Sequence, residues 1–63
     1  MMATIRYNLI RETVLSSGRV LRERIDAVYD GEAASMIAAE MTARIRSQPG
    51  NEHDRVIVSE ERV

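Results

Sequence analysis

The chain has 63 residues, of which 44% are hydrophobic and 30% are charged, a balance typical of one small globular domain rather than a disordered chain. Its nine basic residues are all arginine, and ten acidic residues leave a formal charge of -1, without the positive surplus of a general nucleic-acid binder. The lack of cysteine excludes disulfides, thiolate nucleophiles and cysteine zinc sites. No apolar run is long enough to span a membrane and no signal-peptide pattern opens the chain, so we expect a cytoplasmic protein.

Residues 3–15 alternate between apolar and polar side chains, and this period of two predicts a half-buried strand. A turn is expected after it, around Gly18, because glycine adopts a positive φ without steric cost. The apolar positions of the alternation are Ile5, Tyr7 and Leu9, and the polar positions are Arg6 and Asn8.

Residues 20–29 fit either a strand or a helix, because their apolar residues can form a stripe in both. Cross-strand pairing favours the strand. A three-residue loop at 17–19 would place Glu12 opposite Arg24, a favourable pair of opposite charges. The same register would place Leu15 opposite Leu21, Leu9 opposite Ala27, and Tyr7 opposite Tyr29. We therefore predict a β-hairpin.

A helix is predicted over residues 31–47, with Asp30 as its N-cap and arginines in its last turn, where they complement the helix dipole. Pro49 and Gly50 end it, and a β-branched run predicts a last strand at 55–59. One stripe of the helix is apolar: Ala34, Ile37, Ala38, Met41 and Ile45.

These elements predict a single α+β domain over residues 1–63 with ββαβ order. The expected sheet has three mainly antiparallel strands in the order 2-1-3, with the helix packed on one face. The face expected to receive the helix carries Ile5, Tyr7, Leu9, Leu15, Leu21, Ile25, Ala27 and Tyr29.

No catalytic constellation is recognisable. His53 is the single histidine, in a polar loop, and a metal site needs three or four converging ligands. No glycine-rich phosphate loop is present. We expect a protein that is not an enzyme and that uses no cofactor or metal.

The sheet face without a helix is the most informative predicted surface. It interleaves aliphatic residues with arginines and carboxylates, a mixture typical of protein interfaces. We expect it to bind a protein partner or a second copy of the chain. The predicted partner-binding residues are Arg6, Asn8, Ile10, Val20, Arg22, Arg24, Val28 and Ile57.

In size and element order the chain resembles small ββαβ accessory proteins of bacteriophages and mobile elements, including several anti-CRISPR proteins. The matching features are the alternating strand 4–10, the turn at Ser17 and Gly18, the helix start at 30–32 and the closing strand 56–58. The resemblance implies stoichiometric inhibition, in which a compact surface occludes a site on a larger host complex. The nearly neutral charge favours steric blocking over mimicry of nucleic acid.

The alternative resemblance is to ribbon-helix-helix repressors and antitoxins. It requires residues 3–10 to form a DNA-binding ribbon and residues 19–30 to be helical. Arg6 and Asn8 would then contact base edges in the major groove. The turn signal at residues 16–18 and the lack of a basic surplus argue against it.

Overall fold

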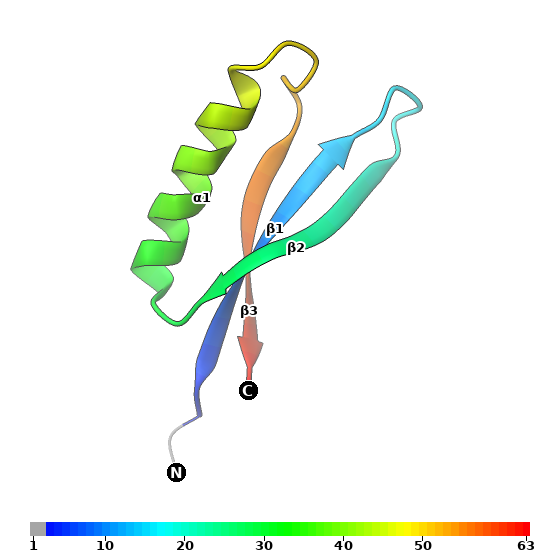
Figure 1. Ribbon diagram of the computed structural model, residues 1–63. Helices are drawn as coiled ribbons and strands as arrows, with labels where there is room; N and C mark the ends of the chain where they lie inside the picture. The colour runs from blue at the N-terminus through cyan, green and yellow to red at the C-terminus, as the bar shows by residue number, and fades with distance from the viewer. Residues whose placement is uncertain (1–2) are drawn as a thin grey trace.

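The computed structural model describes residues 3–63, so Met1 and Met2 of the predicted domain lie outside the described residues. In chain order the elements are β1 (Ile5–Val14), β2 (Val20–Val28), α1 (Gly31–Arg46) and β3 (Arg55–Arg62) (Figure 1). The sheet order is β2-β1-β3, and both pairings are antiparallel. The predicted ββαβ fold is confirmed. A ribbon-helix-helix arrangement is not the fold of this chain, because β2 occupies the segment that would have to be helical.

The third strand is longer than predicted. Its last residues pair with the start of β1, with Glu60 opposite Tyr7 and Arg62 opposite Ile5, and the Val63 N–H donates to the Thr4 carbonyl at 2.9 Å. This polar segment carries little hydrophobic signal of its own. It becomes a strand because β1 offers it an edge to pair with.

The hairpin has a different register from the predicted one. Glu12 lies opposite Arg22 rather than Arg24, and Thr13 lies opposite Leu21. The loop consists of residues 16–18, and Gly18 has a φ of 91°. A three-residue hairpin loop needs a residue with positive φ at its third position. Glycine meets that need without strain, whereas the predicted loop would have placed Arg19 there.

A β-bulge then changes the faces of the second half of β2. Ile10 pairs with Arg24 but Leu9 pairs with Asp26, so Ile25 has no residue opposite it. Because side chains alternate across a strand, one extra residue moves every later side chain to the other face. From Asp26 onward the predicted face assignment of β2 is therefore wrong.

The helix begins as the sequence predicts. The Asp30 carboxylate accepts from the backbone N–H groups of Glu32 and Ala33, at 2.9 and 3.1 Å. The two buried alanines of α1, Ala34 and Ala38, pack against Leu9 and Val56. Around this cluster lie the half-buried Tyr7, Val28, Ile37, Met41, Ile45 and Val58. The predicted apolar stripe of the helix is confirmed.

The core lies on one side of the sheet and leaves most of β2 outside it. Val28 is the one residue of β2 that packs against the core. We call residues 13–21 the hairpin arm; it extends away from α1 (Figure 1). The chain is accordingly thin, with extents of 46 × 21 × 12 Å and a radius of gyration of 13.1 Å, against about 10.6 Å for a compact domain of this length.

We predict that Leu9→Ala strongly destabilises the fold. Leu9 is fully buried, and truncating such a residue costs about 3 kcal/mol, a large share of the stability of a small domain. Urea unfolding followed by circular dichroism measures the effect. The control is Ile10→Ala, on the other face of the same strand and half-buried, which should cost about half as much. Equal losses would contradict the one-sided core.

Candidate protein-binding face

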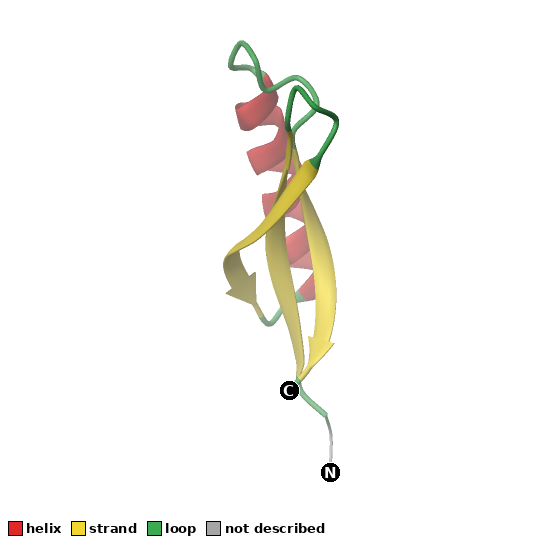
Figure 2. Cartoon of the chain, turned by 90° about the vertical axis from the view of Figure 1, so that its right-hand side faces the viewer, coloured by secondary structure: helices red, strands yellow, loops and turns green. Residues whose placement is uncertain are grey.

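The face of the sheet opposite α1 has no covering element among residues 3–63 (Figure 2). We call it the uncovered face. Leu9 packs on the helix side, so the even-numbered residues of β1 project to the uncovered face. Cross-strand register then assigns the residues of the neighbouring strands. The members are Arg6, Asn8, Ile10, Glu12 and Val14 of β1, Val20, Arg22, Arg24 and Ala27 of β2, and Arg55, Ile57, Ser59 and Glu61 of β3.

Seven of the eight predicted partner-binding residues lie together on this face. The seven are Arg6, Asn8, Ile10, Val20, Arg22, Arg24 and Ile57. The exception is Val28, which lies opposite Tyr7 and packs against the core on the helix side. The bulge at Ile25 is the reason. Whether the seven residues bind a partner stays a prediction.

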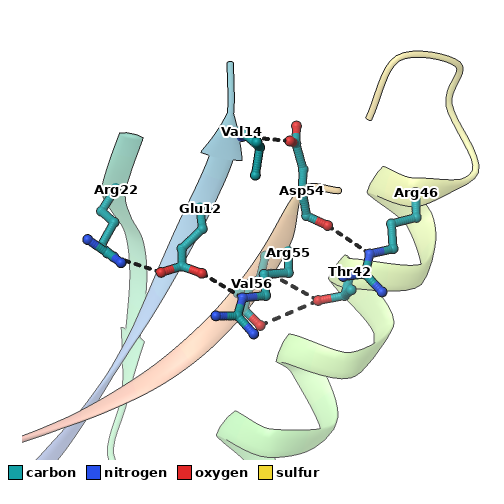
Figure 3. Close-up of polar contacts among 8 residues, drawn as sticks. All are labelled: Glu12, Val14, Arg22, Thr42, Arg46, Asp54, Arg55 and Val56. Carbon is teal, nitrogen blue, oxygen red and sulfur yellow. Dashed lines mark hydrogen bonds and ion pairs between the residues drawn. The ribbon is translucent and has the colours of Figure 1, made fainter. Parts of the chain in front are cut away.

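A buried carboxylate at the centre of the face ties all three strands together. Glu12 is 5% exposed, and each of its oxygens accepts from one arginine. Arg22 Nε of β2 donates to Oε2 at 2.7 Å, and Arg55 Nε of β3 donates to Oε1 at 2.5 Å (Figure 3). These hydrogen bonds, from Arg55 first and then Arg22, hold the pKa of Glu12 below its ordinary value of 4.5. Glu12 is therefore ionised at neutral pH.

A second polar row crosses the lower part of the face. Glu61 of β3 pairs with Arg6 and also accepts from Asn8 Nδ2 at 3.2 Å. The hydrogen bonds from Arg6 and then Asn8 lower the pKa of Glu61. Asn8 is only 8% exposed, so it supports the face from beneath rather than projecting from it.

Asp54 anchors the upper end of the sheet to the helix. Its buried carboxylate accepts from the Val14 N–H at 3.0 Å, and its carbonyl accepts from Arg46 Nε at 2.9 Å (Figure 3). The carboxylate also accepts from Arg11 at 3.2 Å. The Val14 N–H, and after it Arg11, lowers the pKa of Asp54. These contacts fix the end of β1. They therefore also fix the position of Glu12, near that end, and of the arginines that pair with it.

Sequence reasoning missed Arg55 and Glu61 as members of this face and left Tyr29 on the wrong side. Arg55, Ile57, Ser59 and Glu61 are two positions apart in the sequence, a spacing that places them on one face of a strand. This signal was available, but the strand was expected to end at residue 59. Tyr29 is 65% exposed and lines a shallow hollow beside the bulge. The hollow is lined by Arg6, Arg24, Ile25, Asp26, Ala27 and Tyr29.

The uncovered face differs in charge from the rest of the chain. It carries four arginines against two glutamates, a surplus of two positive charges, whereas the whole chain has a formal charge of -1. Arg24 makes no ion pair among residues 3–63. Aliphatic residues lie between the charged ones, with Ile10 directly opposite Ile57. The face is thus equipped for binding an acidic and partly apolar surface.

The described part of the chain offers no metal centre, since no three His, Asp or Glu side chains converge in it. Its one helix is too short and too polar to cross a membrane.

We predict that acid weakens the fold through these carboxylates. A pKa lower in the folded than in the unfolded state means that the unfolded chain binds more protons, so stability is full above the ordinary pKa and is lost as pH falls through the folded-state value. The free energy of unfolding should therefore hold above about pH 5 and decline below 4.5. Urea titrations between pH 7 and pH 3 measure this decline.

Glu12→Gln should lower stability at pH 7 and flatten the acid decline, because its arginines lose their carboxylate at every pH. Glu40→Gln, at an exposed position of α1, serves as the control and should leave both unchanged. An acid decline as steep in Glu12→Gln as in the wild type would contradict the role of Glu12.

Comparisons with protein-family models, with curated proteins and with solved structures find no match for this chain. No relative therefore supplies a function for this chain.

Proposed function

We propose that the chain is a small non-enzymatic protein-binding module that acts in the cytoplasm as a stoichiometric inhibitor. In this proposal it lays its uncovered face against a larger host complex and occludes a site there. This is the mode of action that the resemblance to phage and mobile-element accessory proteins implies. The observation that carries the proposal is the face itself, which has aliphatic residues and exposed arginines and which no element of residues 3–63 covers.

Two features favour protein over DNA as the partner. The side chains expected to contact bases in the alternative, Arg6 and Asn8, are both held by Glu61, and Asn8 is nearly buried. The aliphatic pair Ile10 and Ile57 lies in the middle of the face, where a phosphate backbone would leave it unpartnered. DNA contacts go mainly to charged and polar groups instead.

We predict that Arg24→Glu combined with Val20→Glu abolishes partner binding. Val20 is 42% exposed, and Arg24 makes no ion pair in the described chain, so neither substitution removes a contact that holds the sheet together. The matched control is Arg44→Glu with Met36→Glu, which makes the same chemical changes at exposed positions of α1.

Each immobilised variant is incubated with an extract of the source cells, and the retained proteins are identified by mass spectrometry. The wild type and the control should retain the same protein, and the face variant should lose it at least tenfold. Size-exclusion chromatography with light scattering then gives the stoichiometry. Equal retention by all three variants, or recovery of nucleic acid alone, would contradict the proposal.

We also propose that two copies associate through the side of the hairpin arm that faces away from the uncovered face. Leu15 and Leu21, on that side, are 36% and 45% exposed and lie beyond the reach of the core. The surface area of the chain, 4813 Å², exceeds that of a compact monomer of its mass by about 700 Å². Each partner in a standard protein interface buries about 800 Å² of its surface, which is similar to this excess.

Sedimentation velocity measures this association. The expected mass is twice the 7.1 kDa of the chain. Leu15→Ser with Leu21→Ser should give monomers, whereas Val14→Ser with Val20→Ser, on the opposite side of the same arm, should leave the dimer intact. A monomeric wild type would overturn the dimer. Dissociation by the valine pair would instead make the uncovered face the dimer interface.

A further inference from the structure

Glu12 and the two arginines that donate to it, Arg22 and Arg55, form a charged row across the uncovered face. In this row a single buried carboxylate holds two arginines. Arg22 and Arg55 lie opposite Glu12 on its two neighbouring strands, and each donates to it through Nε (Figure 3). The row therefore carries one positive charge more than it carries negative charges. Both guanidinium groups are held in place by an acceptor that is itself almost fully buried.

The outer ends of these two arginines remain available. Their side chains are 63% and 56% exposed, and within residues 3–63 neither makes a hydrogen bond other than the one from Nε to Glu12. The two terminal nitrogens of a guanidinium form a fork that binds a carboxylate through two parallel hydrogen bonds. Glu12 thus leaves free the part of each arginine that recognises a carboxylate end-on.

The row also constrains the spacing of what it binds. The Nε atoms of Arg22 and Arg55 donate to the two oxygens of one carboxylate, at 2.7 and 2.5 Å, so the two guanidinium groups lie closer together than the backbones that carry them. Residues three or four positions apart on one face of an α-helix are also close neighbours. A single acidic helix lying across the strands would match both arginines.

Apolar residues flank the charged row on both sides along the strands. Ile10 and Ile57 lie two residues away in one direction, and Val14 and Val20 lie two residues away in the other. An interface with apolar contacts around fixed, charge-assisted hydrogen bonds has the composition of a protein-binding hot spot. Because apolar residues lie on both sides of the charged row, the match is to an acidic protein segment.

We propose that the partner contributes an acidic segment with two neighbouring carboxylates, which bind the outer ends of Arg22 and Arg55 while its aliphatic side chains pack on Ile10 and Ile57. Glu12 is the positioning residue of this site, because it touches the arginines and not the partner. This inference rests on the proposed function, since it names the chemistry of the partner at the same face.

The probe is a library of random 16-residue peptides displayed on phage and selected against the immobilised full chain. Selected peptides should carry Asp or Glu at paired positions, most often three or four residues apart, with aliphatic residues near them. The tightest peptide is then synthesised with a fluorescent label, and its affinity is measured by anisotropy. Replacing its two acidic residues by amides should weaken binding at least tenfold.

Variants of the chain test each role. Arg22→Gln and Arg55→Gln should each weaken the peptide at least tenfold, and Arg44→Gln on α1 should not. Glu12→Gln should weaken it as well. A double-mutant cycle distinguishes positioning from mere support of the fold: once Glu12 is replaced, Arg22→Gln should cost much less than it does in the wild type. Additive effects would overturn the positioning role of Glu12.

The outcomes separate this inference from the proposed function. Selected peptides with no acidic preference, still lost on Arg24→Glu with Val20→Glu, would overturn the acidic partner while leaving the face as a binding surface. Peptides insensitive to every change on the face, or no selected peptide at all, would overturn both. An acidic peptide that tolerates Arg22→Gln and Arg55→Gln would overturn the two-arginine site.

Discussion

One helix has to cover a sheet that is larger than itself, and the rest of the structure depends on this mismatch. Sixteen residues make a helix about 24 Å long, whereas the ten residues of β1 extend about 33 Å. The residues of α1 that are buried against the sheet are Ala34 and Ala38, which let α1 approach closely but bury little area each. The helix therefore covers β1 and β3, and the hairpin arm and the whole opposite face stay open to solvent.

Polar contacts on the central strand supplement this small core. Buried carboxylates are costly unless their partners compensate the lost hydration, and Glu12 and Asp54 each have two donors on neighbouring segments. Such an arrangement suits arginine at positions 22 and 55. A guanidinium can donate to a buried carboxylate through one nitrogen and still present two others to solvent, whereas a lysine offers a single ammonium group.

The fold was predictable because its signals are local: the alternation around Tyr7, the cap at Asp30, the break at Pro49. The register of β2 was not predictable, because Glu12 finds a partner of opposite charge whether it pairs with Arg22 or with Arg24. The φ of Gly18 decides between the two, and the bulge at Ile25 leaves no mark in an apolar-polar pattern. Glu61 escaped notice for a related reason: the end of its strand, residues 60–62, is polar and extends the strand through pairing with β1 rather than through its own hydrophobicity.

The core and the proposed binding site lie on opposite sides of β1, and they meet at one residue. Leu9 builds the core on the helix side, and no arginine of the other side belongs to that core. Glu12 is that residue, since the same two hydrogen bonds join three strands and orient Arg22 and Arg55. A partner that binds these arginines binds only the folded sheet, so it stabilises the fold in proportion to its concentration. A domain with so small a core would thereby obtain from its partner the buried apolar surface that α1 alone does not provide.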